Sequence, residues 1–310
     1  MFRVAVVGCG GIGRARANSW KAAGAEVVCV VDLIEEKAAA LAKSVGCGYT
    51  ADLEALPENL DAVSVTTPPS AHYKVTKRLL ERGFNVFCEK PLTLVTEQGE
   101  ELDALAAKKG LTLAVGFKMR FEPIFIEAKK HIGEIGRLMH ITSTKQQAYN
   151  PRPEAEWIQH TGAMYELSVH DFDLISYITG RNPVGVLYAK VSHRFGWEKE
   201  DAFAICADYG DGVTALLEGM YAVKGIFCYR DLTLTFLGDE GYMRVERPDR
   251  IVLHTSEYQV IEIPPAEKSA FVLELTHFMN AVSGREENSL TAACAVNMTR
   301  FINEAYRKGC

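Results

Sequence analysis

A glycine fingerprint directly after the first apolar segment constrains the fold of this chain more than any other feature. Residues 2–7 are almost continuously apolar, and Gly8-Cys9-Gly10-Gly11-Ile12-Gly13 follows them. A buried strand, a glycine turn and the start of a helix, in that order, are typical of the first βα unit of a dinucleotide-binding sheet. There, Gly8 allows the turn, Gly10 lets the backbone approach a pyrophosphate, and Gly13 allows close helix packing.

A second apolar segment, residues 27–31, ends in Asp32. An acid at this distance from the glycine turn accepts hydrogen bonds from the adenosine ribose hydroxyls. Its charge would repel a 2′-phosphate, and Leu33-Ile34 offers no neighbouring arginine to offset that repulsion. We therefore expect NAD, with NADP the less favoured cofactor. The alternative role for Asp32 is a helix cap, because Glu35 lies three residues on as in a capping box, and both roles can hold together.

Strands and helices are expected to alternate up to residue 115, which predicts a doubly wound parallel sheet. The expected strands are 2–7, 27–31, 63–66, 85–88 and 111–115, and the expected helices are 35–45, 72–81 and 96–109, with Gly110 as a C-cap. After Gly116 we expect helices at 123–132 and 162–179, a strand at 138–147, a long loop at 148–160, antiparallel strands between 184 and 263, and helices at 268–283 and 291–308. The chain of 310 residues thus predicts a Rossmann domain at 1–118 and a domain at 119–310 built on a large, mainly antiparallel sheet.

The third inner strand ends in Thr66-Thr67-Pro68-Pro69, where a loop would pass beneath the nicotinamide ribose. We expect Thr67 and Pro68 to contact the cofactor there. His72 begins the next helix, where it could cap the helix or touch the cofactor, and a structural role is the favoured one of the two.

Lys90 follows the strand at 85–88 within Glu89-Lys90-Pro91, at the edge where open α/β sheets bind ligands. An ammonium near the nicotinamide could stabilise developing alkoxide charge or take part in proton transfer. Glu89 could pair with Lys90 or hold a backbone amide, and we expect both residues beside the cofactor. The alternative is a surface lysine before a turn proline.

Glu166 and His170 are four residues apart on a predicted helix, which would place them on one face. The carboxylate could set the imidazole tautomer, and His170 could then take an alcohol proton. A metal site is the competing interpretation, but two side chains make an incomplete ligand set, so no metal is expected.

In the loop region, candidate substrate contacts are Arg120, Tyr149, Arg152 and Trp157, the last of which could equally be a packing residue.

Composition argues against several other classes of protein, namely nucleic-acid-binding, membrane-spanning, secreted and zinc-binding proteins. The net charge of −6 carries no basic block, which argues against nucleic acid. No apolar run approaches the ~20 residues that span a bilayer, and the N-terminus has no signal-peptide layout. The eight cysteines include no CxxC pair. We therefore expect no zinc site, no membrane partner and a reducing, cytoplasmic compartment.

Taken together, these residues resemble the Gfo/Idh/MocA oxidoreductases, the family of glucose-fructose oxidoreductase and inositol dehydrogenase. The likeness covers essentially the whole chain. Its markers are the glycine fingerprint, Thr67-Pro68 with His72, Glu89-Lys90-Pro91, Gly116-Phe117-x-x-Arg120-Phe121-x-Pro123, Gly133-x-Ile135-Gly136, and Gly162-x-x-x-Glu166-x-x-x-His170-Asp171-x-Asp173. The resemblance implies that Lys90 is the catalytic lysine, that the Lys90–Pro91 bond is cis, that His170 relays the proton, and that an open sheet face forms a homodimer or homotetramer. The family more commonly has Asp in place of Glu166.

The sequence therefore predicts an NAD(H)-dependent oxidoreductase that moves a hydride between nicotinamide and a secondary hydroxyl or ketone of a sugar, cyclitol or related polyol. One alternative within this class is a nucleotide-sugar 3-dehydrogenase of the UDP-hexosamine type. A second alternative is a dinucleotide-binding regulator without catalysis. Such a regulator would be expected to lack the lysine or the histidine, and this chain has both Lys90 and His170.

Overall fold

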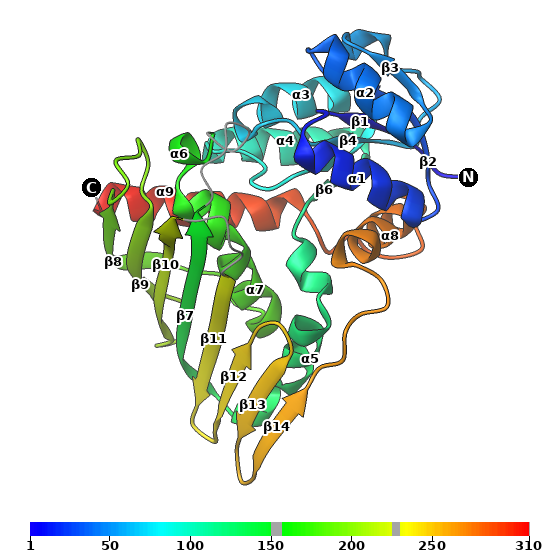
Figure 1. Ribbon diagram of the computed structural model, residues 1–310. Helices are drawn as coiled ribbons and strands as arrows, with labels where there is room; N and C mark the ends of the chain where they lie inside the picture. Colours follow the sequence, from blue (N-terminus) through cyan, green and yellow to red (C-terminus); the bar gives the residue numbers. More distant parts are fainter. Residues whose placement is uncertain (150–156, 225–229, 310) are drawn as a thin grey trace. The chain divides into compact units, whose positions relative to one another are not determined.

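The chain forms two compact units. The computed structural model describes residues 1–149, 157–224 and 230–309 (Figure 1). The first unit comprises Met1–Lys118 and Lys268–Val296, and the second comprises Met119–Glu267 and Asn297–Cys310. The predicted domain 119–310 is therefore divided, because Lys268–Val296 belongs to the first unit.

The first unit is built on a six-stranded sheet in which every pair of neighbouring strands is parallel. Its strands are β1 (Arg3–Val7), β2 (Glu26–Val31), β3 (Gly48–Thr50), β4 (Ala62–Val65), β5 (Asn85–Cys88) and β6 (Leu113–Val115). The order β3-β2-β1-β4-β5-β6 is that of a doubly wound dinucleotide-binding sheet, with its switch point between β1 and β4. The predicted Rossmann fold is confirmed, and the short edge strand β3 is an addition to it.

The helices of this sheet begin and end close to the predicted residues. They are α1 (Gly11–Ala22), α2 (Glu35–Val45), α3 (Pro69–Glu81) and α4 (Thr96–Lys109), with a 3₁₀ turn at Leu53–Ala55. Gly46 and Gly110 follow α2 and α4 in the left-handed conformation that favours glycine at a helix C-cap. Figure 1 shows these four helices alongside β1–β6.

Helix α8 (Ala270–Val282) belongs to the first unit because its buried face packs there. Phe278 meets the rings of Trp20 and Phe87 edge-on, with centroids 5.9 and 5.5 Å away. Glu274, one turn earlier, forms a buried ion pair with Arg16 of α1. These contacts join residues more than 180 positions apart in the chain, and so no local pattern reveals them.

The second unit is built on an eight-stranded sheet of order β14-β13-β12-β11-β7-β10-β9-β8. Its strands are β7 (Leu138–Tyr149), β8 (Gly185–Ser192), β9 (Ala202–Asp208), β10 (Thr214–Lys224), β11 (Arg230–Gly238), β12 (Tyr242–Glu246), β13 (Arg250–His254) and β14 (Tyr258–Glu262). All neighbours are antiparallel except β7 and β10, which confirms a mainly antiparallel sheet. It is not a simple succession of hairpins, because β7 is inserted between β10 and β11.

Helices of the second unit differ from the prediction near the candidate site. They are α5 (Pro123–His131), α6 (Ile158–Thr161), a π-helical turn (Met164–Ser168) and α7 (Val169–Thr179), with 3₁₀ turns at Lys118–Phe121 and Ile132–Ile135. The expected helix 162–179 is thus divided. Of the expected loop 148–160, residues 148 and 149 lie in β7 and residues 158–160 lie in α6, while residues 150–156 lie outside the described residues. Helix α9 (Ala292–Gly309) closes the chain.

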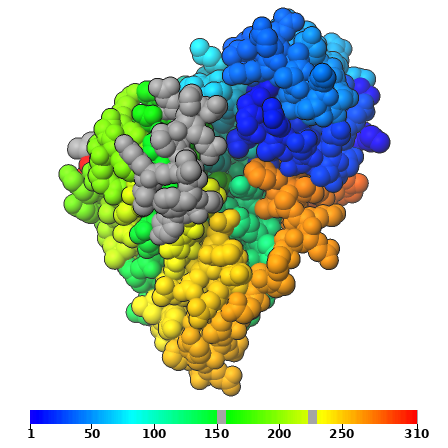
Figure 2. Space-filling view, viewed as in Figure 1, coloured from blue at the N-terminus to red at the C-terminus, as the bar shows by residue number. Residues whose placement is uncertain are grey.

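One face of the large sheet carries exposed apolar side chains. Leu187 and Tyr188 of β8 and Leu216 of β10 are each more than half exposed. In Figure 2 strands β11–β14, yellow to orange, lie at the surface with no helix of the second unit in front of them. This is the face that the family resemblance assigns to contacts between subunits.

Candidate functional site

The glycine turn between β1 and α1 is closely packed at Gly8 and Gly13 and is open at Gly10 and Gly11. A Cβ built at Gly13 would lie 1.9 Å from the carbonyl oxygen of Gly8, and one at Gly8, where φ is +100°, would lie 2.7 Å from the Thr66 carbonyl. Gly10 and Gly11 are exposed, and a Cβ on either would meet no atom within 4 Å. The first turn of α1 contains no acidic residue. An exposed helix N-terminus without acidic residues fits a pyrophosphate.

Asp32 lies at the end of β2 and holds the glycine turn. One carboxylate oxygen accepts a hydrogen bond from the backbone N–H of Cys9 (2.8 Å) and the other from that of Ile34 (2.9 Å). The capping-box alternative is not realised, because α2 has Ile34 as its N-cap and no side-chain capping bond. Each carboxylate oxygen retains a lone pair that a ribose hydroxyl can use.

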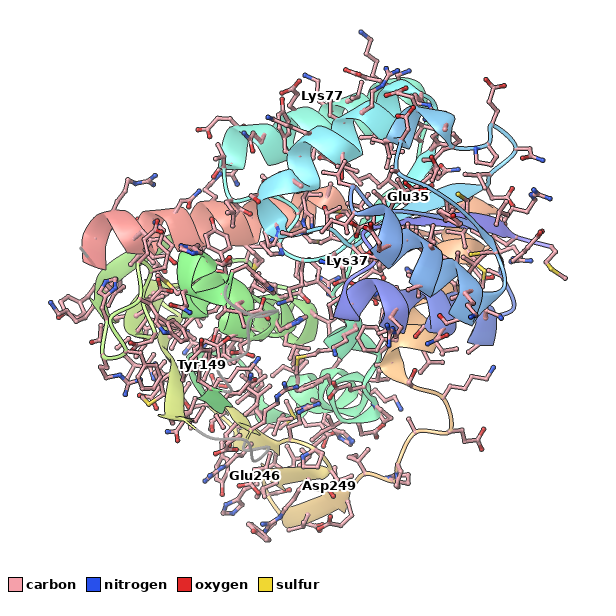
Figure 3. All side chains as sticks on the ribbon, turned by 45° about the horizontal axis from the view of Figure 1, so that its top comes forward. Glu35, Lys37, Lys77, Tyr149, Glu246 and Asp249 are labelled. Atoms are coloured by element: carbon pink, nitrogen blue, oxygen red, sulfur yellow. The ribbon has the colours of Figure 1, made fainter. Side chains whose placement is uncertain are left out.

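The surroundings of Asp32 fit an unphosphorylated ribose. Leu33 is 92% exposed, and Ile34 is also exposed. The first turn of α2 begins with Glu35 and Glu36 before Lys37 (Glu35 and Lys37 are labelled in Figure 3). This local excess of negative charge fits NAD better than NADP.

The residues after β4 include one hydroxyl that is hydrogen-bonded to the glycine turn and one that has no partner among the described residues. Thr66 Oγ1 donates to the Gly8 carbonyl at 2.8 Å. The next hydroxyl, Thr67 Oγ1, is buried and has no hydrogen-bond partner among the described residues. Buried polar atoms rarely stay unbonded, so a bound ligand that reaches Thr67 would satisfy this one.

His72 joins two loops. Its Nε2 lies 2.8 Å from the Thr67 carbonyl oxygen and its Nδ1 lies 2.7 Å from that of Pro91. Both neighbours are acceptors, so each ring nitrogen that carries a hydrogen can donate to one of them. Burial lowers the pKa of His72, and the two carbonyl bonds oppose this. With both nitrogens used inside the first unit, His72 fits the structural role that the sequence favours.

Lys90 lies two residues after the end of β5 and is partly exposed. The Lys90–Pro91 peptide bond is cis, as the family resemblance implies. The preceding Glu89 is buried, and its carboxylate accepts a hydrogen bond from Arg16, a residue that the sequence analysis does not single out. The sequence predicts that Glu89 pairs with Lys90 or holds a backbone amide, and Arg16 is a further partner that this prediction does not include. It could not be foreseen because Arg16 lies 73 positions away.

In the second unit, Glu166 and His170 come from different kinds of helix. Glu166 lies in the π-helical turn and is partly exposed, whereas His170 is buried in the first turn of α7. Burial raises the pKa of Tyr221 on β10 well above its usual range, and the Glu166 carboxylate adds to the rise. The charge of Glu166 therefore acts on the Tyr221 hydroxyl.

Buried charges hold both ends of the π-helical turn. Glu200 accepts a hydrogen bond from the Met164 N–H at 2.8 Å and another from the Tyr306 hydroxyl at 2.6 Å. The Lys145 ammonium of β7 donates to the Leu167 carbonyl at 2.6 Å. A π-helical turn shifts the hydrogen-bond pattern by one residue, and such turns are frequent at functional sites.

The same lysine supports the residue after His170. Lys145 Nζ also donates to a carboxylate oxygen of Asp171 at 2.8 Å. Burial raises the pKa of Asp171, and the Lys145 charge opposes the rise. The sequence gives no signal for Lys145, which lies in the middle of a strand.

The four predicted substrate contacts have different surroundings. Arg120 is buried and makes two hydrogen bonds to Asp173, the first at 2.8 Å from Nε. Tyr149, labelled in Figure 3, is buried among aromatic rings, with the Trp197 centroid 4.6 Å away. Trp157 is partly exposed at the start of α6, and Arg152 lies outside the described residues. Arg120 and Tyr149 are therefore held by the second unit itself.

Metal clusters and membrane-spanning helices are both absent from the part of the chain that the structure describes. No group of three or more His, Cys, Asp or Glu side chains there could hold a metal ion. None of the helices described is long and apolar enough to cross a membrane.

Comparisons with known proteins agree with this architecture. Residues 2–117 match the profile of an oxidoreductase family with an NAD-binding Rossmann fold, GFO_IDH_MocA, and residues 126–244 match the C-terminal domain profile of the same family. The scyllo-inositol 2-dehydrogenase (NAD⁺) of Bacillus subtilis is 29% identical over 308 residues, which cover 90% of this chain and 86% of that protein.

A second relative and a solved structure extend the comparison. The UDP-N-acetylglucosamine 3-dehydrogenase of Acidithiobacillus ferrooxidans is 32% identical over 185 residues, 60% of this chain and 56% of that protein. An oxidoreductase from Agrobacterium radiobacter, solved with NAD⁺, L-tartaric acid and magnesium, superposes with a TM-score of 0.90 over 99% of this chain and 96% of its own. At 17% identity, that structure supports the fold alone.

Proposed function

Because the chain belongs to the Gfo/Idh/MocA oxidoreductase family, with its NAD-binding Rossmann domain, we propose that it is an NAD-dependent dehydrogenase of polyols. The substrate is a secondary hydroxyl, or the matching ketone, of a sugar, cyclitol or related polyol. The observation that carries the proposal is the glycine turn, which is open at Gly10 and Gly11 and lies beside the partly exposed carboxylate of Asp32. The relative in Bacillus subtilis, named as an NAD⁺-dependent inositol dehydrogenase, supports this substrate class.

Residues 1–118 would hold the cofactor, which accepts a hydride at its nicotinamide ring when it is bound. The backbone from Gly8 to Gly13 would bind the pyrophosphate through N–H groups at the start of α1. Asp32 would accept hydrogen bonds from the adenosine ribose. Thr67 and Pro68 would line the nicotinamide side, while His72 and Glu89 act through the loops that they hold.

Lys90, His170 and Glu166 would carry the chemistry. The Lys90 ammonium stabilises negative charge on the substrate oxygen, and His170 takes the hydroxyl proton while the hydride leaves carbon. Glu166 orients the substrate or the imidazole. Among the remaining predicted contacts, Trp157 and Arg152 stay candidates for substrate recognition, and Arg120 acts by positioning α7 through Asp173.

The test is a substrate panel with purified protein. We expect scyllo-inositol, myo-inositol or a related polyol to reduce NAD faster than NADP, followed by the absorbance of the reduced cofactor. Substitution of Lys90 by Ala supplies the matched control, because it removes the reacting ammonium and leaves the glycine turn intact. If no polyol, sugar or nucleotide sugar reduces either cofactor, while NAD still binds, the protein is better described as a dinucleotide-binding regulator.

The nucleotide-sugar alternative belongs in the same panel. The relative in Acidithiobacillus ferrooxidans is named for UDP-N-acetylglucosamine, and its identity to this chain is 32%. Turnover of UDP-N-acetylglucosamine in preference to free polyols would select this alternative.

We also propose that the protein assembles as a homodimer or homotetramer through the open face of the large sheet. The exposed side chains of Leu187, Tyr188 and Leu216 support this arrangement. A cytoplasmic location fits the free thiols of the six described cysteines. A mass measurement in solution that yields a monomer at micromolar concentration would refute the assembly.

A further inference from the structure

We propose that Arg16 is a positioning residue for Lys90, because it holds the glutamate that precedes the lysine and ties it to α8. The inference rests on the proposed function in one respect, that Lys90 contacts the reacting atoms. Arg16 lies on α1, three residues after Gly13 of the glycine turn, and its side chain is fully buried.

The guanidinium of Arg16 has a single geometry available to it. Its Nε donates to Glu89 and its Nη1 donates to Glu274 at 2.5 Å. Its Cζ also lies over two aromatic rings, 4.7 Å from the Phe87 centroid and 4.5 Å from the Phe271 centroid. A planar group that donates two hydrogen bonds and packs against two rings is restricted in position and in rotation.

Gly116 shows how closely the surrounding chain fits this arrangement. A Cβ at Gly116 would lie 2.9 Å from Nη2 of Arg16 and 3.0 Å from the second carboxylate oxygen of Glu89. The absence of a side chain at Gly116 therefore makes room for the ion pair. Close packing against this ion pair therefore explains why glycine occupies position 116, one of the residues on which the family resemblance rests.

The backbone on both sides of Lys90 is held. The Glu89 N–H donates to the Val65 carbonyl at 2.9 Å, and the Pro91 carbonyl lies 2.7 Å from His72 Nδ1. Arg16 fixes the Glu89 side chain from a third direction. The Lys90 side chain therefore extends from an anchored backbone into partly exposed space, and small displacements of such a group reduce rates strongly.

The charges of this network indicate that it positions the loop around Lys90 and adds little to the stability of the first unit. Arg16 faces two carboxylates, so the buried group is negative when both are ionised. Burial lowers the pKa of Arg16, but the two carboxylates more than offset this and raise it overall. A buried ion network adds little net stability compared with apolar residues of the same size, while loss of one partner leaves an uncompensated charge.

The experiment removes all three charges at nearly constant volume, with Arg16→Met, Glu89→Gln and Glu274→Gln combined. We expect the NAD dissociation constant and the polyol KM to stay within about threefold and kcat to fall about 100-fold, the loss expected from a misplaced catalytic group. Hydrogen–deuterium exchange at the amides of Glu89 and Lys90 should accelerate about tenfold, because local opening becomes easier. Glu274→Gln alone preserves the Arg16–Glu89 pair and should keep most of the turnover.

The controls separate this inference from the proposed function. Glu287→Gln, an exposed position in the same unit, should change neither turnover nor exchange. If the triple variant does not fold, Glu89→Met alone removes the acceptor for Arg16 Nε, keeps a neutral Arg16–Glu274 pair and should give the same two losses. Unchanged kcat, or unchanged exchange at Lys90, would overturn the positioning role. If the wild type oxidises no polyol, the proposed function fails, and the exchange measurement still decides whether Arg16 holds the loop.

Discussion

The buried carboxyl of Glu274 should make the stability of the first unit depend on pH, and Glu274→Gln isolates this dependence. Burial raises the pKa of Glu274 from its ordinary value of 4.5 to about 7, although the Arg16 charge opposes the rise. One carboxylate oxygen accepts a hydrogen bond from Arg16. The other, Oε1, has no hydrogen-bond partner among the described residues and is the atom that would hold the proton.

The sign of the effect follows from proton binding in the two states. The unfolded chain releases this proton near pH 4.5, whereas the native state keeps it until about pH 7. The stability from this group is therefore fully present below the unfolded pKa and is lost as pH rises through the folded pKa. For these two values, the linkage relation gives a loss of about 2.5 kcal/mol between about pH 5 and pH 8.

Urea unfolding measures this loss. Glutamine cannot titrate, and its side-chain oxygen can still accept from Arg16. We expect the wild type to lose about 2.5 kcal/mol more than Glu274→Gln over the same pH interval. Trp20 is fully buried in the first unit, so its fluorescence reports on that unit once Trp157 and Trp197 are replaced by Phe.

Glu287→Gln is the matched control, because Glu287 is exposed in the same unit. Its stability should follow that of the wild type across the pH range. A constant difference between wild type and Glu274→Gln from pH 5 to pH 8 would refute the reasoning, since Glu274 would then titrate in the native state as it does in the unfolded chain.

Other predictions concern the proposed chemistry and its support. Lys90→Ala should reduce turnover at least ~100-fold with NAD binding retained, as loss of a charge-stabilising group does, and unchanged turnover would remove Lys90 from the mechanism. Asp32→Ala should lower the NAD/NADP ratio of kcat/KM, and an unaltered ratio would show that the ribose is held elsewhere. Lys145→Met should destabilise the second unit by about 3–5 kcal/mol by leaving Asp171 unpaired, and adding Asp171→Asn should restore most of the loss in a denaturation measurement. Glu166→Asp should reduce kcat, because the side chain is one methylene shorter and the backbone of the π-helical turn, held at both ends, cannot move to compensate. An equal kcat would show that the backbone of the turn does move.

The fold of the first unit could be predicted from the sequence because its signals are local. The apolar strands, the glycine turn and the capping glycine Gly110 each report on neighbouring residues, and α2 and α4 begin and end where the pattern predicts. The placement of α8 could not be predicted in this way. It depends on Phe278 and Glu274 meeting Trp20 and Arg16 across most of the chain.

The candidate site shows the same division. The spacing of Glu166 and His170 predicts a shared helix face, but it assumes an α-helix throughout. The π-helical turn requires a hydrogen-bond donor for the Leu167 carbonyl, and Lys145 supplies it from a distant strand. A single sequence without its pairing partners contains no local mark of such a donor.

The charged residues of the candidate site and its surroundings fall into a buried group and a partly exposed group. A charge inside a protein requires a partner, and so Arg120 is bonded to Asp173, Lys145 to Asp171 and Arg16 to Glu89. The charged groups that the proposed chemistry uses, on Asp32, Lys90 and Glu166, are all partly exposed. A charge that must meet a ligand has to remain accessible, whereas the charges that anchor it are stronger when water is excluded. The buried pairs therefore fix the backbone from which the accessible groups extend, and substitutions in the pairs should affect rate through geometry and substitutions in the accessible groups through chemistry.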